Sequence, residues 1–485
     1  MSKSKAIDCP EIDRAPPQVG EIHDAEKYMH HDAVFGDMGE GGPNYRNVRI
    51  EHNIVTTTSD LFKLGWIGTA VLMTKTQIGL GVLGIPSVLN TVGLIPGIIL
   101  LLVVGGITTW SDYIVGDFKI RHRHVYSIDD VGEMLFGPIG REFFGVALSL
   151  SFTFIAGSAM LSISIAFNAL SNHAICTAIF VAIAAVITFV FASIRTLGKI
   201  SALAWVGAAS IIISVFTVTI AVGVQDRPAA APQQGPWKSD YKLFSSPTYA
   251  EAQTAVSTLI FAYAGTPAFF PIVSEMRDPR QYTKALVACQ TLVTVTYITI
   301  GLIVYYYCGT YVASPALGSA GAIIKKVAYG VALPGLFVTA LLWTHLPAKY
   351  IFVRILRGSP HLTANTITHW ITWIGSTFTI TLVAYIIASS VPVFEDLVSL
   401  VGASFQTLLS TQTMGMMWLY DNWPVSKRVR DSRWYIGVAW SVFVIVAGTY
   451  LMVGGTYSSI LAIIKSYHES GWTAAWSCAD NSNSS

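Results

Sequence analysis

The sequence KTQIGLGVLGIP occupies residues 75–86 and lies inside a long apolar run. Three glycines and a proline weaken a helix there, because glycine costs about 1 kcal/mol and proline about 3 kcal/mol relative to alanine. The stretch matches the G-x-G-x-x-G pattern of dinucleotide-binding loops, but no predicted strand precedes it and Pro86 follows directly. The pattern therefore predicts an interrupted helix and not a nucleotide site.

The composition indicates that this helix lies in a membrane. Apolar residues make up 53% of the 485 residues, and charged residues only 12%, whereas soluble domains carry about 25% charged residues. The net charge is +2, so no bulk attraction to nucleic acid follows. These values exclude a soluble enzyme, a nucleic-acid-binding protein and a disordered secreted protein.

Eleven apolar runs are long enough to cross a bilayer as helices, which takes about 20 residues each. The runs lack the alternation of a membrane barrel, so we predict an all-α integral membrane protein. The predicted spans are 65–89, 94–118, 142–170, 174–194, 200–223, 250–275, 284–308, 323–353, 366–389, 395–419 and 434–463.

The spans form two sets of five and one extra helix. Residues 65–223 hold the first set, residues 250–419 the second, and residues 434–463 the eleventh span. Residues 127–136 have apolar side chains at helical spacing and are expected to form a short interfacial helix, capped by Ser127 with Asp130 at its third position.

The segments outside the spans differ in charge and composition. Residues 1–60 are rich in acidic side chains and hold no apolar run, so we expect a disordered tail. Lysine and arginine concentrate in the connections on the side of this tail, which places it in the cytosol. The linker 224–249 and the tail 466–485 are then extracellular.

A second interrupted helix is predicted in the sixth span, where the sequence FAYAGTP occupies residues 261–267. Glycine and proline are common in membrane helices, so one such break would be explained as a packing kink. Two breaks at a five-span offset favour a transporter's binding site, since such sites form where helices of the two halves are interrupted.

The two breaks offer backbone groups that suit a zwitterion. Free N–H groups near residues 81–83 would bind a carboxylate, and free carbonyl groups near residues 75–79 and 259–262 would bind an ammonium group. The lining is apolar and aromatic, which favours neutral amino acids. The predicted substrate-binding residues are Ile78, Gly79, Leu80, Gly81, Val82, Leu83, Phe261, Ala262, Tyr263, Ala264 and Gly265.

Lys75, Gly79, Gly81, Leu83 and Pro86 reproduce the pattern Lys-x-x-x-Gly-x-Gly-x-Leu-x-x-Pro, and the chain thereby resembles the amino acid/auxin permease family. The sequence EMRDP at the end of the sixth span resembles that family too, and within it the fungal N-system permeases of neutral amino acids are most similar. The resemblance covers most of the chain. It implies a LeuT-type five-plus-five inverted repeat, uptake driven by protons and the plasma membrane.

Two ionisable residues in the spans are candidates for proton coupling. Charges in membrane spans are expensive and usually functional, although Lys75 could also be an anchor that reaches the interface. The resemblance places Lys75 where sodium-coupled relatives have an asparagine ligand, and His345 near their threonine ligand. We predict that Lys75 and His345 flank the coupling site; the alternative for His345 is a satisfied interior histidine.

Other ionisable residues have more ordinary explanations. Asp112 and Asp117 are expected to pair with Lys119 or Arg121 near the end of the second span. Glu275 and Arg277 are expected to form an inner ion-pair network that acts as a gate. The five cysteines, Cys9, Cys176, Cys289, Cys308 and Cys478, lack C-x-x-C spacing and predict neither a metal site nor a disulfide framework.

The sequence therefore predicts a proton-coupled importer of neutral aliphatic and aromatic L-amino acids that works by alternating access and is not an enzyme. It needs no cofactor and no metal. Its expected partners are amino acids, protons and the lipid bilayer, together with regulatory partners of the N-terminal tail, and no nucleic acid. Two alternatives stay open, namely an amino-acid sensor with little flux and a vacuolar exporter of the same fold.

Overall fold

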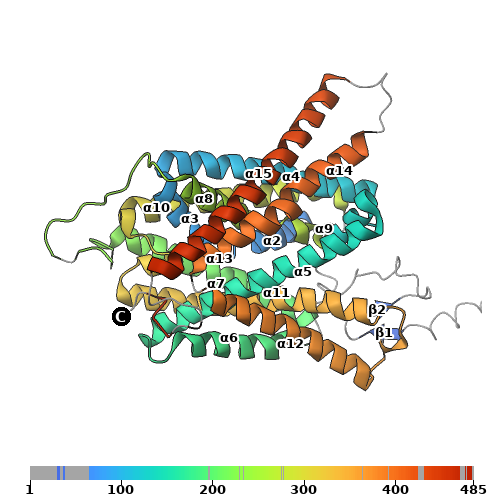
Figure 1. Ribbon diagram of the computed structural model, residues 1–485, viewed down its shortest axis with the longest axis horizontal. Coiled ribbons are helices and arrows are strands. Elements are labelled where there is room, and N and C mark those ends of the chain that lie inside the picture. Colours follow the sequence, from blue (N-terminus) through green and yellow to red (C-terminus); the bar gives the residue numbers. More distant parts are fainter. Residues whose placement is uncertain are drawn as a thin grey trace, which may run out of the picture.

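The computed structural model describes residues 30–32, 36–38, 65–194, 197–228, 230–232, 234–274, 276, 278–362, 364–391, 393–423, 431–469, 476 and 478–482. Most of these residues belong to a bundle of long helices (Figure 1). Two short strands, β1 (His30–Asp32) and β2 (Gly36–Met38), pair antiparallel.

The helices follow the order of the predicted spans. They are α2 (Trp66–Gln77), α3 (Ile85–Val92), α4 (Leu94–Arg121), α5 (Ile128–Ser171), α6 (Thr177–Ala192), α7 (Leu197–Val224), α8 (Tyr249–Ala262), α9 (Thr266–Ser274), α10 (Tyr282–Cys308), α11 (Ala322–Ile355), α12 (Ile367–Ser390), α13 (Phe394–Val401), α14 (Thr413–Asn422) and α15 (Ser432–Glu469). Short 3-10 helices are η5 (Gly81–Gly84), η6 (Pro279–Gln281), η7 (Gly309–Tyr311), η8 (Ala316–Ser319) and η9 (Pro360–Leu362), and π-helices are η10 (Gly402–Gln406) and η11 (Leu408–Gln412).

Eight helices in the described ranges are long and apolar enough to cross a membrane, or nine if the bent pair of α2 with Gly81–Val92 is counted as one span. A helical membrane protein is thereby confirmed. Two predicted spans fall outside this test, because α6 has only 16 residues and the predicted span 395–419 is divided. There, η10 and η11 separate α13 from α14.

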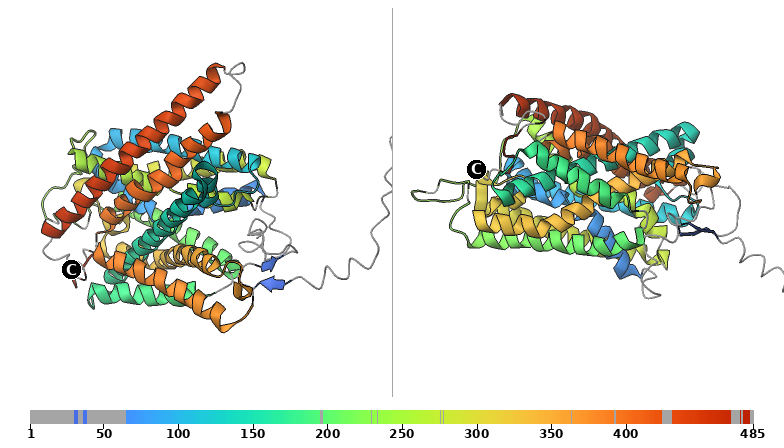
Figure 2. Two further views of the ribbon diagram at one scale, coloured as in Figure 1. Left: turned by 45° about the vertical axis from the view of Figure 1, so that its right-hand side comes forward. Right: turned by 90° about the horizontal axis from the view of Figure 1, so that it is seen from below.

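The packing places α11 at the centre of one half of the bundle and α15 on the surface of the other. α11 packs against α5, α7 and α12, whereas α15 packs against α8, α13 and α14. Figure 2 shows α15 crossing the bundle obliquely along its outer face. Many side chains of α15 are exposed and apolar, as expected of a helix that faces lipid.

The predicted helix at residues 127–136 is confirmed as the first part of α5. Its start is capped as expected, since the Ser127 N–H donates to the Asp130 carboxylate at 3.3 Å. Gly137 then adopts a φ of 72° and is followed by Pro138, and this kink separates the short helix from the long remainder of α5. The kink needs glycine, because other residues rarely adopt a positive φ.

α5 connects two ends of the molecule that differ in chemistry. At the first, Arg141 lies 2.9 Å from Glu133 and 3.8 Å from Asp129 and Asp130, and Arg354 of α11 pairs with Glu142. We call this the charged end. The opposite end holds the α5–α6 connection and residues 478–482, and we call it the disulfide end (Figure 1, left).

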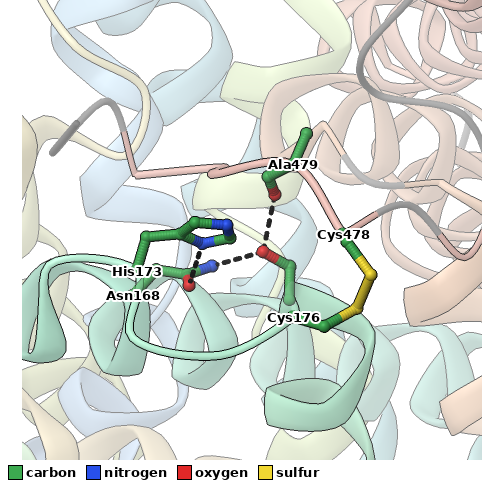
Figure 3. The surroundings of a disulfide bond; sticks show 6 residues. Asn168, His173, Cys176, Cys478 and Ala479 are labelled. Atoms are coloured by element: carbon green, nitrogen blue, oxygen red, sulfur yellow. Dashed lines mark hydrogen bonds between the residues drawn. A yellow bond between two sulfur atoms is a disulfide. The ribbon is translucent and has the colours of Figure 1, made fainter.

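A disulfide joins Cys176 to Cys478, so the prediction that the cysteines form no disulfide is wrong. Figure 3 shows the hydrogen bonds beside it, in which Asn168 donates to Thr177 and Thr177 donates to the carbonyl of Ala479 at 2.6 Å. The two cysteines are 302 residues apart. Spacing along the chain carries no signal for such a pair, because only the folded bundle brings its last residues to the α5–α6 connection.

Candidate functional site at two helix breaks

The first predicted break is present. α2 ends at Gln77, residues 78–80 are not helical, and the chain resumes as η5 and then α3. The axes before and after the break differ by 48°. Glycine at residues 79, 81 and 84 and proline at residue 86 account for this interruption, because each disfavours the continuous helix.

The second predicted break is present as well. α8 ends at Ala262, residues 263–265 are not helical, and α9 begins at Thr266. Pro267 lies in the first turn of α9, where a missing N–H costs nothing. Both interruptions follow from the local sequence.

The two breaks are in direct contact. A Cβ atom on Gly81 would overlap the backbone of Ala262, so glycine is required for this approach. Gln77 Nε2 donates to the carbonyl of Tyr263 at 3.2 Å. The Tyr297 hydroxyl of α10 lies 2.9 Å from the carbonyl oxygen of Gln77 and 2.8 Å from that of Ala262, and links both helix ends.

The backbone groups of the two breaks have different partners. In the first break, the N–H groups of residues 79–82 have no hydrogen-bond partner within the described part of the chain, whereas Leu83 donates to Leu80. In the second, the N–H groups of Tyr263, Ala264 and Gly265 all donate to carbonyls of residues 259–263. Only the first break therefore presents a row of free donors.

A cavity of about 930 Å³ extends from the breaks to the charged end. Of the predicted substrate-binding residues, those that line it are Gly79, Leu80, Gly81, Phe261 and Ala264. The others pack around the breaks without lining the cavity, and these are Ile78, Val82, Leu83, Ala262, Tyr263 and Gly265. The cavity joins free N–H groups to an apolar and aromatic wall.

Part of that wall could not be predicted from the sequence. Phe152 of α5 and Trp343 of α11 line the cavity with ring centroids 4.7 Å apart. Gln406 lines it from the π-helix η10 and donates to Ser151 at 3.0 Å. Aromatic residues are frequent throughout the spans, and the pattern gave no sign of which ones face inward.

Of the two residues predicted to flank a coupling site, only Lys75 is among those that line the cavity. Lys75 lines the cavity, and its ammonium group has no partner in the residues that the structure describes. His345 is buried on another face of α11, where its Nδ1 lies 3.1 Å from the carbonyl oxygen of Ala192 and its ring contacts Trp373. His345 faces α6 and α12 and does not line the cavity, and its role in coupling stays a prediction.

The remaining ionisable residues give mixed outcomes. Asp117 pairs with Arg121 at 2.8 Å, as predicted, but Asp112 faces Gln290 of α10 instead of a cation. The predicted gate residues Glu275 and Arg277 lie outside the described residues. In the described ranges, no group of three or more His, Cys, Asp or Glu side chains could hold a metal ion.

Comparisons with known proteins identify relatives among membrane transporters. A family model described as "Transmembrane amino acid transporter protein" matches residues 63–461. A "Transmembrane transporter" from Fusarium pseudograminearum is 33% identical over 86% of this chain and 88% of its own length. The "N amino acid transport system protein" of Neurospora crassa is 30% identical with the same coverage. The "Amino acid transporter AVT1J" of Arabidopsis thaliana is 24% identical over 77% of this chain and 87% of its own.

Proposed function

This chain belongs to the family of transmembrane amino acid transporter proteins, the amino acid/auxin permeases, and on that premise we propose that it imports neutral aliphatic and aromatic L-amino acids together with protons. Its family and relatives are transporters and not enzymes. The observation that carries the proposal is the contact between two interrupted helices beside a cavity with free backbone donors.

The substrate proposal follows from the chemistry of the cavity. The free N–H groups of residues 79–82 suit a carboxylate, and the positive charge of Lys75 adds to their attraction. Phe152, Phe261 and Trp343 form an apolar wall that fits an uncharged side chain. The name of the Neurospora relative, an N amino acid transport system protein, agrees with this class.

The transport mechanism we propose is alternating access around the two breaks. Eleven spans arranged as two inverted sets of five, residues 65–223 and 250–419, would place the breaks in the first span of each set. The cavity extends to the charged end, whereas residues 478–482 lie across helix ends at the disulfide end. Closing the cavity at the charged end and opening a path at the disulfide end would complete the cycle, with Glu275 and Arg277 as the proposed gate.

The orientation we propose puts the disulfide end outside the cytosol. Disulfides persist in oxidising compartments and are rare in the cytosol, so the bond between Cys176 and Cys478 supports an external C-terminal tail and a cytosolic N-terminus. The proposed membrane is the plasma membrane. After mild reduction of intact cells, a membrane-impermeant maleimide should label Cys176 and Cys478, and protection of both would contradict this orientation.

For coupling we propose Lys75, because its charge lies in the same cavity as the free donors. Lys75→Met should remove the pH dependence of uptake while the protein still reaches the membrane. His345→Gln serves as the second variant, since His345 lies behind the cavity wall. If His345 takes part in coupling, this variant should also lose the pH dependence of uptake. A wild-type pH response in Lys75→Met would contradict the assignment.

The function itself is tested by uptake of labelled leucine at two pH values, in cells that lack their own neutral amino-acid uptake. We expect accumulation against a gradient, faster at the lower external pH, with competition by aliphatic and aromatic amino acids and none by lysine or glutamate. A sensor would bind leucine without accumulating it. A vacuolar exporter would be located in an internal membrane and would be absent from the cell surface.

A further inference from the structure

Asp112 is a carboxylic acid in the interior of α4, fully buried between helices. It lies nine residues before the end of α4 at Arg121 and is surrounded in the sequence by apolar and aromatic residues. An ionisable group in such a place is costly in a membrane protein and is retained where it binds an ion or relays protons. The substrate cavity does not include it, so its role is separate from substrate contact.

The surroundings of the Asp112 carboxyl group are polar but short of donors. Gln290 Nε2 donates to Oδ2 at 2.5 Å, and the side chains of Gln77 and Thr266 lie beside the carboxyl group. Oδ1 of Asp112, Oγ1 of Thr266 and Oε1 of Gln290 have no hydrogen-bond partner among the described residues. Asp112 Oδ1 and Gln290 Oε1 can only accept a hydrogen bond, whereas the Thr266 hydroxyl group can donate to one of them. The other oxygen is therefore left without a donor.

The titratable groups around Asp112 do not supply a positive charge. α10 contributes Tyr282 and Cys289, which face the carboxyl group, and the Tyr282 hydroxyl donates to the Asp112 carbonyl at 2.8 Å. Neither α9 nor α3 has a charged residue in its described part, and Tyr263 lies in the second break, directly after the end of α8. On α14, Asp421 is paired with His122 at the charged end. Of the ion pairs between described residues, none includes Asp112.

We propose that Asp112 is a proton-binding residue that links the coupling proton to the two helix breaks. A proton on Oδ1 supplies the missing donor, which the neighbouring oxygens of Gln290 and Thr266 can accept. Without that proton a negative charge is buried with no cation beside it, which is unfavourable. The proposal rests on the proposed proton-driven uptake and adds a second titrating group to Lys75.

The position of the cluster allows the protonation state of Asp112 to affect the structure of the substrate site. Gln77 is the last residue of α2 and donates to the carbonyl of Tyr263 in the second break, whereas Thr266 is the first residue of α9. Both breaks are therefore tied to the group that gains or loses the proton. Loss of the proton favours separation of α9 from α4, because the ionised carboxyl group needs water or other donors.

The experiment uses the purified full-length chain in proteoliposomes with labelled leucine, and compares Asp112→Asn with the wild type. Asparagine has the shape of the neutral acid and binds no proton. With one proton per leucine, an inward gradient of one pH unit drives about tenfold accumulation in the wild type. We expect Asp112→Asn to show no accumulation while it still exchanges internal for external leucine. Asp117→Asn, five residues further along α4 and paired with Arg121, is the matched control and should retain both activities.

Gln290→Met is the second variant, in case Asp112→Asn yields no folded protein. It removes the donor to Oδ2, so the pH at which uptake is half-maximal should rise. Gradient-driven accumulation by Asp112→Asn, or a wild-type pH midpoint in Gln290→Met, would overturn the proposal. Wild-type accumulation that ignores the pH gradient would instead refute the proposed function, and accumulation driven by a sodium gradient would refute both.

Discussion

The two helix breaks look alike in the sequence and differ in what they offer. The break after α2 leaves the N–H groups of residues 79–82 without partners in the described part of the chain, and three of these residues line the cavity. The break after α8 satisfies its N–H groups by local hydrogen bonds, and its carbonyls at residues 262 and 263 accept from Tyr297 and Gln77. The first break therefore has free donors beside the cavity, which fits its proposed role in binding substrate, whereas the second contacts the first through hydrogen bonds.

This difference shows that an interrupted helix is not by itself a binding site. Unpaired backbone groups are costly inside a membrane. The second break avoids this cost because its N–H groups donate to carbonyls of residues 259–263, whereas the N–H groups of residues 79–82 have no partner among the described residues. The Tyr297 hydroxyl group of α10 joins the two breaks, since it lies against the carbonyl oxygens of Gln77 and Ala262. Variants that change one break and leave the other intact test this division.

The largest effect is expected from Gly81→Ala. The added methyl group would overlap the backbone of Ala262 and push the breaks apart, and a displacement of about 1 Å at a binding group can cost about a hundredfold in activity. Leucine uptake should fall by that order at normal surface expression. The matched control is Gly106→Ala of α4, because a Cβ atom there meets nothing within 4 Å and the residue does not line the cavity. Equal uptake by the two variants would show that the contact is unimportant.

A smaller effect is expected from Tyr297→Phe. The change leaves the carbonyls of Gln77 and Ala262 without the hydroxyl donor, and an unsatisfied buried group costs about 1–3 kcal/mol. The midpoint of thermal inactivation of the purified protein should drop. Tyr305→Phe on the same helix is the control, since its hydroxyl group accepts from the Lys242 N–H near the disulfide end. If both variants lowered the midpoint of thermal inactivation equally, the special role of Tyr297 would be refuted.

The smallest effect is expected from Gly265→Ala. A Cβ atom at this position would lie 2.8 Å from Thr76 Oγ1 and 2.9 Å from Gln77 Cγ, and both are side-chain atoms that can shift. Overpacking of this kind costs about 1 kcal/mol at its mildest, so uptake should fall only severalfold. Adding Thr76→Ala makes room and should restore it. Damage as severe as that of Gly81→Ala would mean that the second break, too, cannot tolerate displacement.

Several features of the fold follow from short stretches of sequence. The breaks at residues 78–80 and 263–265 follow from glycine and proline, which act on the backbone of their own residues. The cap of α5 at Ser127 and Asp130 involves neighbours within one turn. The membrane helices follow from the length of apolar runs. Each of these depends on interactions over a few residues, and each was predictable.

The features that were missed depend on contacts between distant segments. The bond between Cys176 and Cys478 requires the folded bundle. The contacts of His345 also lay beyond sequence reasoning, because they depend on how α11 is rotated against α6 and α12. Asp112 was expected near cations of its own helix, but packing turned it toward Gln290 of α10.

The sequence by itself determined where the chain enters the membrane as helices and where two of those helices stop being helical, because backbone preference and hydrophobic length are local properties. Only the tertiary structure decided that the two interruptions touch and which of them keeps its hydrogen-bond donors free, because the packing of distant helices fixes the backbone conformation at each break.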